Sequence, residues 1–206
     1  AKDKVNSQLS DLNLVALYTC PWPGQGFYFK KAVNSSADTQ GIKFRSYNSA
    51  TATFAEELGM VPVQVEAAEL SQALATGVAE SFISSGSTGY DRKVWESLTH
   101  YYKVNAWLPR NYVIVNKGIW DGLGADTKAN VQKAADETGA ACSAKSAELA
   151  NWYFEQLSAN GMSVEDASSD FLAELEAIGT KMTADWLSAA GSDGQAIIDN
   201  YKAMAN

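Results

Sequence analysis

The apolar and polar residues in the first half of the chain alternate between two periods. Over residues 41–45, Ile42 and Phe44 alternate with polar neighbours, which predicts a short strand with one buried face. Over residues 48–58 the apolar positions recur at helical spacing, and Asn48 is a favourable N-cap residue at the start of that stretch. The pattern therefore predicts a strand followed at once by a helix.

This succession of strand and helix continues further along the chain. The β-branched run at residues 61–65 and the apolar run at 78–85 predict two more strands. Residues 66–77 have the pattern of an amphipathic helix, and residues 90–102 predict another helix. Strands that alternate with helices are typical of a parallel α/β sheet, in which ligands bind outside the carboxyl ends of the strands.

The remaining segments predict fewer strands and longer helices. Two apolar runs, Leu12–Cys20 and Asn111–Lys117, have the pattern of strands. The alanine-rich stretch from about 126 to 160 predicts one helix that is too long for a single small layer, so we expect it to brace two lobes. Beyond it we expect a short edge strand and two helices, at residues 162–168, 169–190 and 193–205.

Composition and charge narrow the possible partners. The 206 residues are enough to bury a large core, and 16 Lys and Arg against 24 Asp and Glu give a net charge of -8. This balance argues against a nucleic-acid surface and against an anionic membrane surface. No apolar run approaches the ~20 residues of a membrane span. A negatively charged ligand would need a local positive site.

Arg45 is the candidate for such a site. It ends the predicted strand directly before a helix start, where free backbone N–H groups and the helix dipole also favour negative charge. Its guanidinium offers paired donors that match the two oxygens of a carboxylate. The alternative is a strand-end arginine that pairs with a surface Asp or Glu.

Histidine and cysteine usage bears on catalysis and metal binding. His100 is the single histidine, and we expect it near a helix end, so a histidine-based triad and a multi-histidine metal site are disfavoured. We predict no catalytic residue, no cofactor and no metal. Cys20 and Cys142 match no metal-binding spacing, and we interpret them as two unrelated structural thiols, with a disulfide as the alternative.

Five features occur in one order along the chain: the strand near Val15, a G-x-K-x-R strand, the segment "ELSQALATG", the strand "VIVNK" and the long helix. In this order they resemble the extracytoplasmic solute-binding proteins of tripartite ATP-independent periplasmic (TRAP) transporters. The resemblance covers nearly all of the chain. It implies a two-lobed α/β fold of the periplasmic-binding-protein type, with parallel or mixed sheets and a lobe-spanning helix, that closes over an organic anion by hinge motion.

Members of that family are longer on the N-terminal side, so we expect the leader and part of the first lobe to be absent here. The resemblance then implies that residues 1–21 and 111–125 are the remnant of the first lobe with the hinge strands. Residues 22–110 form the second α/β lobe, and residues 126–206 form the bracing helix and the C-terminal helices. Because an incomplete lobe exposes strand edges and apolar faces, we expect a dimer or a swapped assembly.

The resemblance also suggests the ligand contacts. It makes Arg45 the carboxylate anchor, while a second arginine of sialic-acid and dicarboxylate binders is replaced by Gln25 and an asparagine of those relatives by Ser84. A single cationic anchor favours a monocarboxylate, such as a 2-oxo, hydroxy or aromatic acid. The remaining expected contacts are aromatic walls and one polar group: Trp22, Tyr47, Trp107 and Asn111.

The resulting hypothesis is a periplasmic solute-binding protein without catalysis, not inserted in the membrane, that delivers a small organic acid to TRAP permease subunits. One alternative is a small α/β hydrolase-like enzyme with Cys20 or Ser84 as nucleophile and help from Glu80 or Asp91. It lacks a nearby histidine base and a G-x-S-x-G elbow. Another alternative is the ligand-binding lobe of a different transporter or receptor class.

Overall fold

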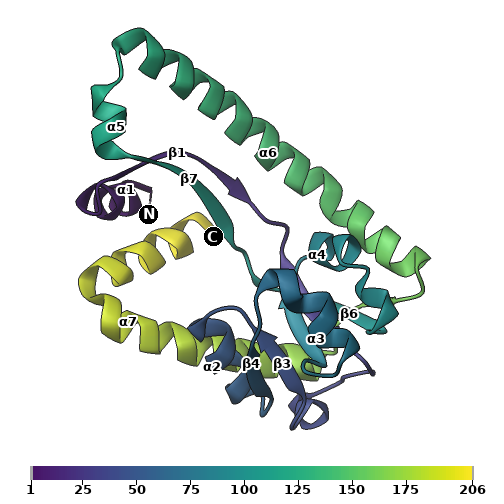
Figure 1. Cartoon of the computed structure of the whole chain (residues 1–206). Coiled ribbons are helices and arrows are strands. Elements are labelled where there is room, and N and C mark those ends of the chain that lie inside the picture. The colour runs from purple at the N-terminus through teal and green to yellow at the C-terminus, as the bar shows by residue number, and fades with distance from the viewer. Residues whose placement is uncertain (1, 206) are drawn as a thin grey trace.

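The computed structural model describes residues 2–205, and its strands form two separate sheets (Figure 1). The six-stranded sheet has the order β4-β3-β5-β2-β6-β8, and the two-stranded sheet pairs β1 with β7. We call the six-stranded sheet with its covering helices the body, and the β1–β7 pair the ribbon. The strands of the body are β2 (Gln25–Phe29), β3 (Lys43–Ser46), β4 (Val61–Gln64), β5 (Ser81–Ser84), β6 (His100–Trp107) and β8 (Ser163–Asp166). The strands of the ribbon are β1 (Leu14–Pro21) and β7 (Arg110–Asn116).

The sheet of the body is mixed. Strand β3 runs parallel to both β4 and β5, and β6 runs parallel to β8, whereas β2 is antiparallel to its two neighbours β5 and β6. The predicted mixed α/β fold is confirmed, and the strand and helix alternation of residues 41–85 gives the parallel strands β4, β3 and β5. Strand β2 runs the other way because it enters the body directly from the ribbon.

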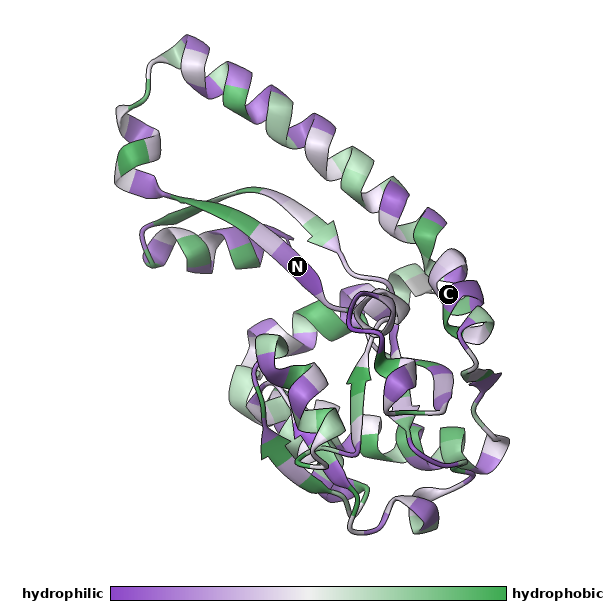
Figure 2. Cartoon of the chain, turned by 45° about the vertical axis from the view of Figure 1, so that its right-hand side comes forward, coloured by the Kyte–Doolittle hydropathy of each residue, from purple (hydrophilic) through white to green (hydrophobic). Residues whose placement is uncertain are grey.

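Helices cover both faces of this sheet. The α-helices are α1 (Lys2–Asp11), α2 (Ser49–Glu57), α3 (Leu70–Ala75), α4 (Gly86–Asp91), α5 (Lys117–Gly122), α6 (Ala125–Ala159) and α7 (Ser169–Ala205). Short 3₁₀ turns in the described part of the chain are η1 (Ser36–Thr39), η2 (Ala67–Glu69) and η3 (Val94–Glu96). Since side chains alternate across a strand, Phe27 packs with α2 and α7 on one face while Tyr28 packs with α3 and α6 on the other. Figure 2 shows hydrophobic residues in the strands of the body and a mixture of hydrophilic and hydrophobic residues along α6.

The predicted helix over residues 90–102 is wrong. Helix α4 ends at Asp91, Lys93 adopts a left-handed backbone with φ 49°, and only a 3₁₀ turn follows before strand β6 begins at His100. Tyr101 and Tyr102 are buried in the two different cores, which a strand between two helical layers achieves and a surface helix does not. The single histidine therefore lies on a strand and not near a helix end.

The ribbon is held against α6, which runs alongside it from α5 to the body (Figure 1). Gly139 permits the close approach of the helix, since a Cβ added there would lie 3.1 Å from the Cβ of Tyr18. One turn further along α6, Cys142 forms a disulfide with Cys20 on β1, with the two Cα atoms 5.6 Å apart. The interpretation of two unrelated thiols is therefore wrong, because the helix packs along the strand that carries the other cysteine.

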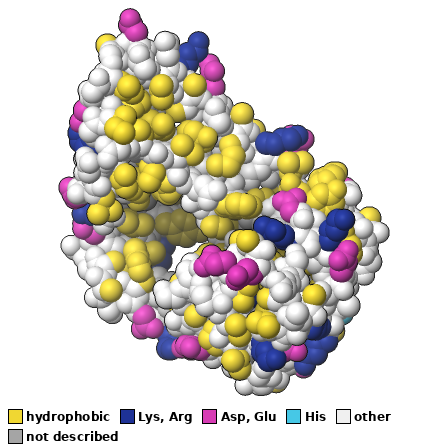
Figure 3. Space-filling view, viewed as in Figure 1, with side chains coloured by type: hydrophobic (Ala, Val, Ile, Leu, Met, Phe, Trp, Pro, Cys, Tyr) yellow, Lys and Arg dark blue, Asp and Glu magenta, His cyan; other side chains and the backbone are white. Residues whose placement is uncertain are grey.

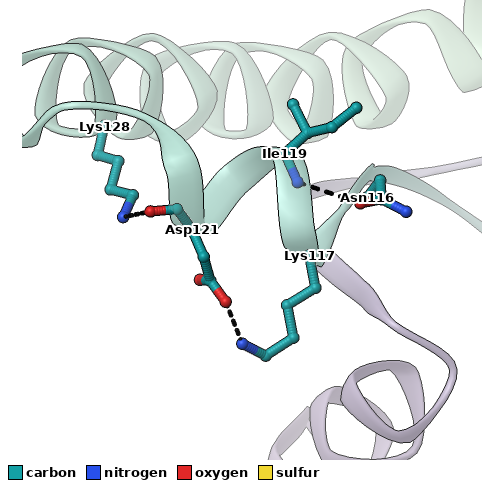
Figure 4. Close-up of polar contacts among 5 residues, drawn as sticks. All are labelled: Asn116, Lys117, Ile119, Asp121 and Lys128. Carbon is teal, nitrogen blue, oxygen red and sulfur yellow. Dashed lines mark hydrogen bonds and ion pairs between the residues drawn. The ribbon is translucent and has the colours of Figure 1, made fainter.

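The far end of the ribbon is closed by hydrogen bonds around α5 (Figure 4). The side chain of Asn116 accepts a hydrogen bond from the backbone N–H of Ile119 at 3.1 Å and so caps α5. Lys117 pairs with Asp121 within the same helix. Lys128 on α6 donates to the backbone carbonyl of Asp121 at 2.9 Å, which ties the two helices together.

Helix α7 combines the two predicted C-terminal helices. They meet at Gly191, where φ is 60° and the helical path breaks. The first part packs on the body through Phe171 and Leu175. The second part turns back toward the ribbon, where Asp193 forms an ion pair with Lys4 of α1 (Figure 1).

Candidate ligand site

One edge of the body collects side chains from distant parts of the sequence. The carboxyl ends of β3 and β5 and the start of the antiparallel β2 all lie at this edge, because Arg45 pairs with Phe82 and Gly26 pairs with Ser84. Strand β6 ends there as well, since Gln25 pairs with Trp107. The edge is also where the chain passes between body and ribbon.

Arg45 is held at this edge without a carboxylate partner. The residue is 6% exposed, and its Nε donates to the backbone carbonyl of Val65 at 2.8 Å. Among residues 2–205 it forms no ion pair, and its terminal nitrogens donate no hydrogen bond to any described group. Burial lowers the pKa of the guanidinium, which still remains charged because an arginine deprotonates only far above neutral pH. The alternative of a surface ion pair is thus not what the structure shows.

Tyr47 and Gln25 adjoin this guanidinium. The Cζ atom of Arg45 lies 5.1 Å from the ring centroid of Tyr47, within cation–π range. The Tyr47 hydroxyl donates to Oε1 of Gln25 at 2.9 Å. Burial raises the pKa of Tyr47, so the phenol stays protonated at neutral pH. Three of the residues expected to contact a ligand are therefore joined in one chain of contacts.

Ser84 lies next to them but points its hydroxyl into the following turn. Its Oγ donates to Oγ1 of Thr88 at 2.8 Å, within α4. Ser85 and Ser87 are buried and share a hydrogen bond of 2.7 Å. At the start of α4, beside the site, these polar side chains therefore hydrogen-bond to one another.

The remaining predicted contacts lie at the crossings between body and ribbon. Trp22 is 41% exposed, and its indole Nε1 donates to Oδ1 of Asn111 at 3.0 Å, so the two residues form one pair. Trp107 instead packs edge-on against Phe54 of α2, with ring centroids 5.4 Å apart. The structure therefore brings Arg45, Tyr47 and Gln25 together, pairs Trp22 with Asn111, and turns Trp107 toward the body core.

The large cavities of the molecule do not coincide with the guanidinium. A cavity of about 710 Å³ lies between the ribbon, α1 and α6, and one of about 640 Å³ lies between α2, β6 and α7. Trp107 lines the second, but Arg45 lines neither. The space-filling view shows a hollow between the ribbon side and the body, with apolar side chains gathered on the ribbon side (Figure 3). Neither large cavity therefore contains the charged group, and the candidate site is defined by the buried guanidinium of Arg45 and its neighbours.

Two contributors to this edge were not predicted from the sequence. The Val65 carbonyl that holds Arg45 lies just beyond the end of β4, the parallel neighbour of β3, so the adjacency of the two strand ends was the available signal. Thr88 is the partner of Ser84, and the four-residue spacing across a helix start was the signal there.

A group of three or more metal-binding His, Cys, Asp or Glu side chains is absent from residues 2–205. No helix in that range is long and apolar enough to cross a membrane.

Comparison with known proteins gives consistent matches. Residues 3–189 match the family model of bacterial extracellular solute-binding protein, family 7. A marine metagenome TRAP solute-binding protein from an unidentified microbe, specific for pyroglutamate and crystallised with it, is 82% identical with a TM-score of 0.95, over 98% of this chain and 66% of that one. DctP6 of Bordetella pertussis, an extracytoplasmic solute receptor binding pyroglutamic acid, is 40% identical with a TM-score of 0.95, over 98% of this chain and 67% of its own.

A curated relative belongs to the same group. The C4-dicarboxylate-binding periplasmic protein DctP of Rhodobacter capsulatus is 34% identical over 102 residues, which is 49% of this chain and 31% of that protein. The chain thus spans about two thirds of the length of the two solved relatives and covers about a third of this curated one.

Proposed function

Because this chain belongs to the bacterial extracellular solute-binding proteins of family 7, the solute-binding proteins of TRAP transporters, we propose that it captures a small monocarboxylic acid through Arg45 and delivers it to the membrane permease. The observation that carries the proposal is the buried guanidinium at the strand end, which has free terminal nitrogens and no carboxylate partner among the described residues. A bound carboxylate supplies the partner that the site lacks.

Family membership rejects the hydrolase-like alternative, since these relatives are solute-binding proteins and not enzymes. The geometry agrees with this conclusion, because the hydroxyl of Ser84 at the end of β5 donates to Thr88 of α4 and Cys20 is in a disulfide. A nucleophile needs an adjacent base to activate it, and among residues 2–205 the side chains of Ser84 and Cys20 hydrogen-bond to no such base.

Pyroglutamate is the ligand that we propose. Two relatives that span nearly all of this chain bind it, one of them at 82% identity. Pyroglutamate carries one carboxylate and a neutral lactam, which suits a site with one cation and the neutral amide of Gln25. A C4-dicarboxylate would leave its second carboxylate facing that neutral amide.

The arrangement of the lobes and the location are part of the same proposal. Residues 22–110 would form one lobe, residues 1–21 and 111–125 the hinge side of the other, and residues 126–206 the brace and the C-terminal helices. The relatives named as periplasmic and extracytoplasmic support a periplasmic protein, with the permease subunits as partners. The expected dimer or swapped assembly is tested by light scattering of the 206-residue chain, where a monomeric mass would contradict it.

The test of the function is titration calorimetry of the full-length protein with pyroglutamate. We expect tight binding in the wild type, and a loss of about a hundredfold or more in the Arg45→Ala variant, because a desolvated charge pair is removed. Arg92→Ala is the matched control, since Arg92 is exposed at the end of α4, and it should bind as the wild type does. Unchanged affinity in Arg45→Ala would move the carboxylate site elsewhere, and a wild type that binds no carboxylic acid would overturn the function.

A further inference from the structure

Tyr47 connects the charged and the neutral halves of the site. Its ring lies against the Arg45 guanidinium, and its hydroxyl reaches the side-chain amide of Gln25. Tyr47 is partly buried, while Arg45 and Gln25 are almost fully buried, at 6% and 7% exposed. One aromatic side chain therefore fixes both groups relative to each other.

The contact with Tyr47 determines what the Gln25 amide can offer to a ligand. A glutamine amide carries one accepting oxygen and one donating NH₂ group. The oxygen, Oε1, already accepts from the Tyr47 hydroxyl at 2.9 Å. The NH₂ group, Nε2, forms no hydrogen bond with any group of residues 2–205. In this arrangement the NH₂ group of Gln25 is the part of the amide that remains available to donate a hydrogen bond to a ligand.

The phenol proton of Tyr47 opposes rotation of the amide by half a turn. Close packing fixes only the backbone beside Gln25, since a Cβ at Gly26 would lie 2.1 Å from the carbonyl oxygen of Tyr102. The guanidinium against the Tyr47 ring draws electron density from the phenol and strengthens its O–H as a donor. A rotated amide would set its NH₂ group against that O–H and leave the phenol proton without an acceptor.

Building on the proposed function, we propose that Tyr47 is a positioning residue that orients the Gln25 amide, so that the site selects monocarboxylic acids which also carry a carbonyl oxygen. The carboxylate of the ligand pairs with Arg45, and its carbonyl accepts a hydrogen bond from Gln25 Nε2. A lactam such as pyroglutamate meets both requirements. Tyr47 acts through Gln25 and does not need to touch the ligand.

The selection has a physical basis in the unpaired donor. An acid without the carbonyl keeps its pairing with Arg45 but leaves Nε2 buried against a hydrocarbon group, which is unfavourable. Sites that are built to hydrogen-bond a ligand group reject analogues that lack it much more strongly than apolar pockets reject a missing methylene. We therefore expect selectivity for the carbonyl-bearing acid of about tenfold or more.

The experiment compares two acids of nearly the same shape in the full-length protein. Pyroglutamate carries the lactam, and cyclopentanecarboxylate has the same ring size and carboxylate without it. The measured quantity is the ratio of their dissociation constants by calorimetry. We expect a ratio of at least tenfold in the wild type, a fall of threefold to tenfold in Tyr47→Phe, and a ratio near one in Gln25→Met. Tyr112→Phe, at an exposed tyrosine of the ribbon, should leave the ratio unchanged.

The outcomes separate this proposal from the function on which it rests. If both acids bind and the ratio is the same in wild type, Tyr47→Phe and Gln25→Met, the orientation proposal is overturned and the function stands. Retained pyroglutamate affinity in Gln25→Met also overturns it, because a thioether at that position cannot donate a hydrogen bond to the ligand carbonyl. If neither acid binds the wild type, the function and the proposal fail together. Melting curves of each variant identify any that does not fold.

Discussion

The body and the ribbon are stabilised in different ways. Strands β2 and β5 of the body are buried at every position, between two layers of helices. In the ribbon, β1 is only half-buried and most of β7 is exposed. The body is stabilised by its buried core, whereas the ribbon depends for its stability on α6 and on the Cys20–Cys142 disulfide. Burial of apolar area stabilises the body, whereas a covalent link and the packing of α6 and α1 on β1 stabilise the ribbon.

This division matches the proposed roles of the two regions. The groups that we propose for recognition all belong to the body. Arg45 lies on β3, Tyr47 directly follows that strand, and Gln25 is the first residue of β2. The chain crosses into the ribbon at two adjacent points, where the N–H of Trp22 bonds to the carbonyl of Pro109 at 3.0 Å. In the proposed two-lobed arrangement, a rigid body would keep the recognition groups in place, while the thin ribbon would bend as the lobes close.

The largest effect that tests this comparison is expected in the core of the body. Phe27→Ala removes a fully buried ring that stacks on Phe29 and Phe54, and should lower the free energy of unfolding by about 3–5 kcal/mol. Ile114→Ala in the ribbon, where the side chain is 44% exposed, should cost less than about 1 kcal/mol. Denaturant titration measures both, and equal losses would contradict the difference between the regions.

The next effect concerns the disulfide. Replacing both Cys20 and Cys142 with serine removes a link between residues 122 apart in sequence, and should lower the free energy of unfolding by about 2–4 kcal/mol. We expect hydrogen exchange to accelerate in β1 and α6 and to stay slow in β2 and β5. Ser143→Ala, at the exposed neighbouring position, is the control. Faster exchange spread evenly over the body would show that the link also stabilises the core.

The smallest effect lies at the far end of the ribbon. The hydrogen bond from Lys117 lowers the pKa of Asp121. Since the folded-state pKa is lowered, the pair stabilises the fold above the ordinary pKa of an aspartate, and this contribution is lost as the pH falls through the lowered value. The carboxyl group is exposed, so solvent screens the pair strongly. In an NMR titration, Lys117→Met should raise the Asp121 pKa, while Lys133→Met should leave it unchanged.

Much of the fold followed from periodicity, and the failures have identifiable causes. The long helix was predicted at about 126–160 and lies at Ala125–Ala159, because an alanine-rich stretch without proline leaves few other structures open. The strand at His100 was missed because Val94, Trp95 and Leu98 have helical spacing, whereas the left-handed turn at Lys93 depends on tertiary packing.

The candidate site was predictable only in part. The position of Arg45 at the carboxyl end of a strand was predictable from the sequence. Its hydrogen bond to the Val65 carbonyl and its lack of an ion pair among the described residues depend on the strand order, which the sequence pattern does not show. The contact between Tyr47 and Gln25 joins residues 22 apart, on segments whose adjacency only the sheet register fixes. The cysteine pair likewise required the docking of α6 on β1.

The disulfide also changes the topology of the polypeptide. Residues 20 and 142 close a covalent ring that contains β2 to β6, and therefore Gln25, Arg45 and Tyr47. A protease that cuts one peptide bond inside this ring opens a loop but releases no fragment until the sulfur bridge is reduced. On an electrophoresis gel without reductant the nicked chain would still migrate as one band, and the ring would keep the cleaved pieces at high local concentration for rejoining their native partners.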